Sequence, residues 1–265
     1  MDLTYELFCG KFRSLTGIDL ASYKQGQMER RILAFISRTG TGGYLPLLKS
    51  MEHDSAKMKE FLDYMTINVS EFFRNPEKFD ELRTRIFPAI LATTRHPRIW
   101  SAGCAGGAEP YSMAIILDEI APDARPEILA TDIDATVLER ARTGWFPPNE
   151  TRNISEPRLS RHFTAERNGL VVSPKISGRV TFKKHNLLED PYPVDCDLIV
   201  CRNVVIYFAD GAKDRVYRGF WASLKTGGVL FVGGTETIFR STEMGFALES
   251  AFMYKKVPTR ATRIA

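Results

Sequence analysis

Hydrophobic positions recur with helical spacing through the first ~85 residues of the chain. Three periodic runs show this pattern. Glycine-containing segments end the first two, and the sequence NVSEFF follows the third. The runs cover residues 2–15, 22–40 and 54–67. None of them alternates with the two-residue period of a strand, so the pattern predicts a helical domain and linker over residues 1–85.

From Arg98 onwards, short apolar runs alternate with segments of helical periodicity. Such alternation is typical of an α/β domain built on a parallel sheet, which we expect over residues 86–265. Strands are expected at 98–104, 127–134, 179–188, 197–208 and 229–234, helices at 110–120, 135–144 and 212–228, and a final antiparallel strand pair within 246–257.

The alternation pauses in a Pro- and Arg-rich stretch at about residues 147–180. Within it, Asn168-Gly169 is a dipeptide that favours a tight turn between two strands. We therefore expect a small β-subdomain inserted into the α/β domain.

Composition narrows the class of protein. The chain has 265 residues, of which 44% are hydrophobic and 26% charged, as in ordinary globular proteins. It has neither a leader-like start nor a run of about 20 apolar residues, so we expect a cytoplasmic protein without membrane insertion. Its four cysteines lack zinc-ligand spacing, which predicts free thiols and no metal site. The net charge of +4 is too small to indicate nucleic-acid binding.

Unusual residues follow the expected strands, at the sheet edge where such folds bind ligands. The loop 105–109 holds two glycines, but their spacing does not fit a pyrophosphate fingerprint and disfavours a nicotinamide cofactor. Asp132 ends the next strand and can accept hydrogen bonds from ribose hydroxyls, while Asp134 is better placed to cap the following helix. Asn186 and Asn203 end two further strands; each alone could be a turn residue, but amides there can contact an adenine or amino-acid group.

Six segments together resemble the chemotaxis receptor glutamate methyltransferases, the CheR family. They are TINVSEFFRN (66–75), WSAGCAGGAEPYSMA (100–114), LATDID (129–134), ARTGWF (141–146), FKKHNLL (182–188) and CRNVVIYF (201–208). The resemblance implies a helical N-terminal domain on a class I S-adenosylmethionine (SAM)-dependent, Rossmann-like domain with a small β-subdomain. It also implies transfer of a methyl group from SAM to receptor glutamates, with S-adenosylhomocysteine as the product.

The resemblance also implies the site residues. Cofactor contacts fall on Asn68, Ser70, Arg74, Glu109, Asp132, Asn186, Leu187, Arg202 and Asn203. Arg74 and Tyr207 are expected beside the methyl group, where they would hold and orient the acceptor carboxylate. From the residues alone, Arg74 could instead pair with Glu71 or Glu77, and Tyr207 could be a core aromatic at a strand end. The chain departs from the family pattern S-T-G-E-E-P-Y at 105–111, where one of two acids is lost and Glu109 is retained.

Two other functions are compatible with the predicted fold. A nucleic-acid amino-methyltransferase of the same fold would carry Asn or Asp followed by Pro-Pro-aromatic, and residues 202–205 lack that run. A non-catalytic SAM-binding scaffold that binds receptors would keep the fold but not transfer methyl groups.

A local positive charge indicates how a receptor could dock. Between Lys11 and Lys49 the sequence has seven basic and two acidic residues, which gives a local net charge of +5. Lys24, Arg31 and Arg38 share one sector of a helix beside an apolar stripe, which is either a solvated face or a docking surface for the acidic helical bundle of a receptor. The hairpin of the β-subdomain is short, so we expect that a receptor's C-terminal tether peptide is not bound. We further expect a monomer that is recruited to receptor arrays.

Overall fold

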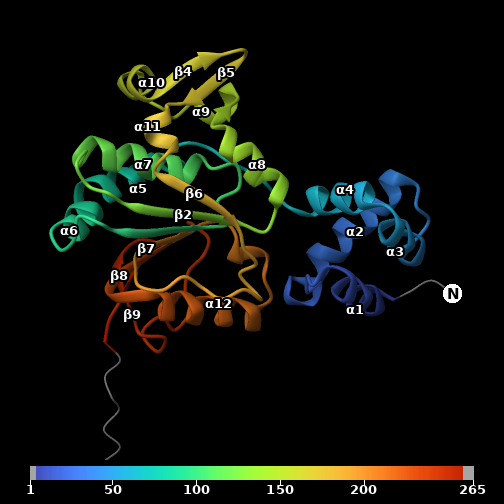
Figure 1. Ribbon diagram of the computed structural model, residues 1–265. Helices are drawn as coiled ribbons and strands as arrows, with labels where there is room; N and C mark the ends of the chain where they lie inside the picture. The colour runs from blue at the N-terminus through green and yellow to red at the C-terminus, as the bar shows by residue number, and fades with distance from the viewer. Residues whose placement is uncertain (1–3, 259–265) are drawn as a thin grey trace, which may run out of the picture. The chain divides into compact units, whose positions relative to one another are not determined.

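The computed structural model describes residues 4–258 and divides into two compact units (Figure 1). The smaller unit comprises the chain up to Ile67 together with Val204–Val216, and the larger comprises Asn68–Asn203 and the chain from Tyr217. Within residues 4–258 no helix is long and apolar enough to span a membrane.

The smaller unit is helical, as its periodicity predicts. Its elements are α1 (Tyr5–Thr16), η1 (Leu20–Ser22), α2 (Gln25–Thr39), α3 (Tyr44–His53), α4 (Ser55–Met65) and η3 (Val205–Tyr207). Local chemistry sets the helix ends: the Asp54 side chain accepts the Ala56 and Lys57 N–H groups at the start of α4, and Gly40 ends α2 at φ 65°. Phe8, Phe12, Phe35 and Phe61 form an aromatic core in this unit.

A segment far along the chain also belongs to the smaller unit. The Lys24 N–H donates to the Tyr207 carbonyl at 2.9 Å, and the Ala209 N–H donates to the Ser22 carbonyl at 2.9 Å. The rings of Tyr23 and Phe208 meet edge to face, 5.1 Å apart. Helix α12 (Asp210–Ser223) begins in this unit and ends in the larger one. Sequence periodicity carried no sign of this return.

The larger unit is built on a seven-stranded sheet in the order β6-β2-β1-β7-β8-β10-β9. The first five strands in this order are parallel, and β10 and β9 are antiparallel, which confirms the expected final pair. The strands are β1 (Arg98–Ala102), β2 (Glu127–Asp132), β6 (Val180–Lys184), β7 (Cys196–Cys201), β8 (Leu224–Val232), β9 (Phe246–Ser250) and β10 (Met253–Lys256).

Helices cover both faces of this sheet. Figure 1 shows α7 and α8 on one face and α12 on the other. On the second face the Trp100 ring of β1 lies 5.4 Å from the Phe220 ring of α12. The helices of this unit before the β-subdomain are α5 (Pro76–Glu81), the π-helical turn η2 (Leu82–Ile86), α6 (Phe87–Leu91), α7 (Ala108–Ile120) and α8 (Ala135–Thr143).

Several predicted element ends were wrong: β6 ends at Lys184 and β8 begins at Leu224, and the ends of β7 and α12 also differ. Strand β7 stops at Cys201 instead of continuing to Phe208, because Asn203 turns the chain at φ 60° and the chain then forms η3. Helix α12 ends at Ser223, because Leu224 already pairs with Cys196 as the first residue of β8.

The β-subdomain is a separate three-stranded antiparallel sheet in the order β3-β5-β4. Its strands and helices are β3 (Trp145–Phe146), α9 (Pro148–Thr151), α10 (Glu156–His162), β4 (Phe163–Glu166), β5 (Gly169–Val172) and α11 (Pro174–Ser177). Arg167-Asn168 alone connects β4 to β5, with Arg167 at φ 53°, which confirms the expected hairpin.

Candidate active site

The candidate site lies in the larger unit, at the carboxyl ends of the parallel strands. The expected residues that follow β1, β2, β6 and β7 meet at this one edge because those strands run in the same direction. The glycine loop connects β1 to α7, and it folds back so that the Gly103 and Cys104 N–H groups donate to the Thr131 carbonyl of β2.

The glycine loop is tightly packed. Gly103, Ala105 and Gly107 have φ values of 79°, 46° and 89°. A Cβ on Gly107 would lie 3.0 Å from the Ala141 Cβ, and one on Gly106 would lie 2.9 Å from an Arg140 nitrogen. Glycine is therefore required at position 107, where φ is positive and the neighbours are close, whereas a Cβ at position 106 would displace only the end of the flexible Arg140 side chain and press on Ser70.

Asp132 binds the loop to the end of β2. One carboxylate oxygen accepts the Ala105 N–H at 2.9 Å, and the other accepts the Asp134 N–H at 3.0 Å. Burial raises the pKa of this half-buried carboxyl group. Each oxygen keeps acceptor capacity for a ribose hydroxyl.

Asp134 caps α8, as expected, by accepting the Thr136 and Val137 N–H groups. Its second oxygen accepts from the Asn68 side-chain amide at 2.7 Å. Ser70 lies nearby in the chain, and its hydroxyl accepts the Ala108 N–H at the start of α7. The segment 68–70 is thus held against the loops that follow β1 and β2.

Glu109 and Arg202 form a buried pair. The Ser101 hydroxyl donates to Glu109 at 2.8 Å, and an Arg202 nitrogen lies 3.6 Å from the other Glu109 oxygen. Burial raises the pKa of Glu109, while the positive charges of Arg202 and Arg74 lower it. A cationic ligand group beside Glu109 would therefore be favoured.

The second terminal nitrogen of Arg202 holds the chain at Arg74 and Asn75. Arg202 donates to the Arg74 carbonyl at 2.9 Å and to the Asn75 side chain at 2.6 Å. Its guanidinium lies 4.8 Å from the centre of the Phe231 ring. These contacts join Arg202 to Glu109 and to the segment that ends at Arg74.

Arg74 ends a segment that is firmly anchored. The Phe72 N–H donates to the Glu150 carbonyl at 2.9 Å, and the Phe73 N–H donates to the Ser112 hydroxyl at 3.0 Å. Arg74 itself is half-buried, and within the described residues its side chain forms no ion pair. Glu71, one alternative partner from the sequence, instead pairs with Arg152 at 3.5 Å.

These groups fit SAM. Glu109 is a half-buried carboxylate that can pair with an ammonium group, and Asp132 can accept hydrogen bonds from ribose hydroxyls. The positive φ values of the glycine loop bring its backbone close to the same edge. A cationic ligand with an amino-acid end and a ribose matches this set of side chains.

Comparison with known proteins gives the family. The family model for the CheR methyltransferase SAM-binding domain matches residues 68–253, and the model for the CheR all-alpha domain matches residues 3–66. The chain belongs to the CheR methyltransferase family. The larger unit has the class I SAM-dependent methyltransferase fold, and its cofactor is SAM.

Similar proteins match the chain over most of its length. It is 39% identical to a chemotaxis protein methyltransferase of Listeria monocytogenes, over 91% of this chain and 92% of that protein. It is 34% identical to one from Salmonella typhimurium, over 96% and 90% of the two chains. A third, from Escherichia coli, is 35% identical over 90% and 85%.

The other residues expected to contact the cofactor make local contacts. The Asn186 side-chain oxygen accepts the Leu188 N–H at 3.0 Å, so this residue also forms a turn. The Leu187 carbonyl accepts from the Tyr192 hydroxyl at 2.6 Å. The Asn203 N–H donates to Glu236 at 2.7 Å. Sequence reasoning missed Glu236, although its place four residues after β8 is a strand-end position like the others.

Tyr207 was expected beside the methyl group; the alternative, a core aromatic at a strand end, was wrong, because Tyr207 does not lie in a strand. It is the last residue of η3, is half-buried, and belongs to the smaller unit, where its carbonyl accepts the Lys24 N–H.

The three basic residues expected to dock a receptor differ in environment. Lys24 is exposed at the start of α2. Arg31 is half-buried; it donates to the Tyr64 carbonyl in the last turn of α4, with its guanidinium 5.2 Å from the Tyr64 ring centre. Arg38 is exposed and pairs with Glu60 at 3.2 Å. Arg31 and Arg38 therefore both join α2 to α4.

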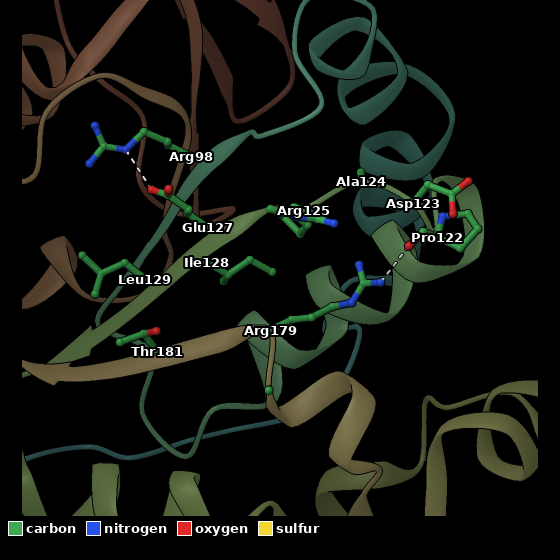
Figure 2. Close-up of a pocket in the computed structure, with 12 residues that line it drawn as sticks. Arg98, Pro122, Asp123, Ala124, Arg125, Glu127, Ile128, Leu129, Arg179 and Thr181 are labelled. Atoms are coloured by element: carbon green, nitrogen blue, oxygen red, sulfur yellow. Dashed lines mark hydrogen bonds and ion pairs between the residues drawn. The ribbon is translucent and has the colours of Figure 1, made fainter.

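A groove of about 880 Å³ lies at the opposite edge of the sheet (Figure 2). Its lining includes Arg98, Glu127 and Thr181, which stand at the amino ends of β1, β2 and β6. Arg98 pairs with Glu127 at 3.3 Å, and Arg179 donates to the Pro122 carbonyl at 3.1 Å. The groove is thus separate from the loops at the carboxyl ends.

Proposed function

We propose that this chain methylates glutamate side chains of chemotaxis receptors, forming methyl esters that serve sensory adaptation. The observation that carries the proposal is that Glu109, Asp132 and Arg74, an arginine that forms no ion pair with residues 4–258, lie at one edge of a CheR-family SAM domain. The relatives named above are chemotaxis protein methyltransferases, and none of them supports the non-catalytic scaffold.

The proposed cofactor set is the one expected from the sequence: Asn68, Ser70, Arg74, Glu109, Asp132, Asn186, Leu187, Arg202 and Asn203. When bound, SAM supplies a methyl group on a positively charged sulfur. A receptor glutamate is ionised near neutral pH, so the site needs no strong general base. Arg74 would hold the carboxylate through its planar fork of donors, and the Tyr207 hydroxyl would orient it.

Replacing Asp132 by alanine is expected to weaken binding of S-adenosylhomocysteine by roughly ten- to a hundredfold, because a charge-assisted hydrogen bond contributes about 1.5–3 kcal/mol. Calorimetric titration measures the loss. Asp132→Asn keeps one oxygen that can accept the Ala105 N–H, so it should lose less than Asp132→Ala. Wild-type affinity in a folded Asp132→Ala variant would refute this assignment.

We also propose that residues 1–85 form the receptor-recognition domain and linker, and that α2 docks on the acidic helical bundle through Lys24, Arg31 and Arg38. Opposite charges accelerate association and set orientation. The enzyme would act as a cytoplasmic monomer at receptor arrays. The two-residue connection from β4 to β5 supports the proposal that no receptor tether peptide binds there.

The docking surface is best tested at its two exposed positions. Lys24→Glu with Arg38→Glu should raise the KM for receptor several-fold and leave the KM for SAM unchanged, because charge complementarity at the rim acts mainly on encounter. Arg31 is left intact because it is half-buried and donates to the Tyr64 carbonyl, whereas Arg38, which also contacts Glu60 and Tyr64 of α4, is exposed.

Arg95→Glu with Arg125→Glu makes the same charge change at two exposed residues of the other unit and serves as the control. The expected effect on receptor KM should shrink as salt rises. Equal effects of the two double variants would show that net charge, not α2, determines docking.

A further inference from the structure

The ends of β7 and β8 bring two loops together beside the candidate site. These strands are parallel neighbours, and Cys201 is paired with Val232 at their carboxyl ends. The residues that follow each strand therefore lie side by side. Arg202 and Asn203 follow β7, and Gly233 to Glu236 follow β8.

Glu236 is a buried carboxylate in the second of these loops, with 4% of its surface exposed. One of its oxygens accepts the Asn203 N–H and the Gly233 N–H, each at 2.7 Å. Its own N–H donates to the Gly233 carbonyl at 2.9 Å, which closes a tight turn. A single oxygen thus joins the backbones that follow two strands.

Gly233 makes this arrangement possible. A Cβ at this position would lie 2.5 Å from the Glu236 oxygen and 2.9 Å from the Asn203 nitrogen. Both distances are shorter than any real Cβ contact, so a side chain here would force the two loops apart. The sequence places the smallest residue where the carboxylate and the amide converge.

Asn203 adopts a left-handed backbone conformation, at φ 60°. This conformation is uncommon for a residue other than glycine, although asparagine tolerates it better than most. The hydrogen bond from the Asn203 backbone N–H to Glu236 holds the backbone in this conformation. The backbone conformation in turn fixes the direction in which the Asn203 side chain leaves the chain.

The negative charge of Glu236 also acts on Glu109 and Arg202. Burial is the main cause of the raised pKa of Glu109, and the negative charge of Glu236 raises it further. For Arg202, burial lowers the pKa while the charges of Glu109 and Glu236 raise it. Glu236 therefore belongs to the same electrostatic cluster as two proposed cofactor residues.

We propose that Glu236 is a positioning residue for SAM binding, acting by holding the Asn203 backbone in its left-handed conformation. The inference rests on the proposed role of Asn203 as a cofactor contact. Glu236 need not touch the cofactor, because it acts by setting the position of the Asn203 side-chain amide.

The test is a double-mutant cycle on S-adenosylhomocysteine affinity, measured by calorimetry with Glu236→Ala, Asn203→Ala and the double variant. Each single change should weaken binding about tenfold, and the double variant should lose no more than about the larger single loss, because the two residues act as one unit. Glu236→Gln retains an oxygen that can accept both N–H groups, so it should recover most of the affinity.

Two further measurements separate positioning from general damage to the fold. Amide hydrogen exchange should show faster exchange of the Asn203 and Gly233 N–H groups in Glu236→Ala but not in Glu236→Gln. Glu243 lies in the same loop, but it is exposed and pairs weakly with Arg240 at 3.9 Å. Glu243→Ala should leave affinity and exchange unchanged.

The outcomes are distinct. Wild-type affinity in Glu236→Ala, or losses that simply add in the double variant, would overturn this inference and leave the role of Asn203 intact. Wild-type affinity in Asn203→Ala would overturn the assignment of Asn203 and, with it, this inference. Non-additive losses with recovery in Glu236→Gln would support both.

Discussion

The Arg74→Ala variant is expected to lower kcat for receptor methylation by roughly a hundredfold, with a smaller loss of affinity for S-adenosylhomocysteine. Misplacing a reacting group by about 1 Å can cost this much, because the barrier depends on prior alignment of the reacting atoms. Arg74 is the group that we expect to align the acceptor carboxylate, since within residues 4–258 its guanidinium is not committed to an ion pair. Single-turnover methylation beside a cofactor titration measures both quantities.

Two control variants accompany Arg74→Ala, one at Arg74 itself and one at an exposed arginine. Arg74→Lys keeps the positive charge but loses the planar fork, so its kcat should fall between those of wild type and Arg74→Ala. Arg83→Ala removes an arginine that is 41% exposed and pairs with Asp80, and it should leave kcat unchanged. A wild-type kcat in Arg74→Ala would reject the proposed role of the side chain.

The Phe72→Ala variant is expected to lower the free energy of unfolding of the larger unit by about 3–5 kcal/mol. Phe72 is fully buried, and its ring centre lies 4.7 Å from that of Phe146 and 5.2 Å from that of Phe163. Both partners belong to the β-subdomain, so the change would open a cavity between that subdomain and the segment leading to Arg74. Urea denaturation followed by tryptophan fluorescence measures the loss.

A matched control for Phe72 is present in the same unit. Phe239 is 84% exposed, so Phe239→Ala should change the free energy of unfolding by no more than about 0.5 kcal/mol. Phe72→Leu fills part of the cavity and should lose less than Phe72→Ala. A loss below about 1 kcal/mol in Phe72→Ala would mean that the site closes without this ring.

Local patterns predicted most of the fold. Helical spacing identified α1, α2 and α4, and the alternation of strand and helix identified the parallel sheet. The ends of β7 and α12 were missed because they depend on contacts across the sheet. Leu224 leaves its helix since Cys196 lies alongside, and a single strand's sequence does not carry that information.

In the candidate site, too, local sequence predicts some features, while others depend on contacts between distant residues. The position of Asp132 at the end of β2 and the helix cap formed by Asp134 could be predicted locally, the cap because a carboxylate next to a helix start has a defined geometry. Arg31 and Glu236 could not. Arg31 donates to a carbonyl 33 residues away, and Glu236 accepts from an amide 33 residues away, so both pairings arise only when the chain has folded.

The return of Val204–Val216 to the helical unit has a consequence for building chimeric enzymes. The chain crosses between the units after Ile67, after Asn203 and after Val216. A graft that exchanged only the first 67 residues would leave behind Phe208, the ring partner of Tyr23, and the carbonyl that receives the Lys24 N–H. The helical unit could therefore be transplanted between relatives only as two pieces of sequence, exchanged together.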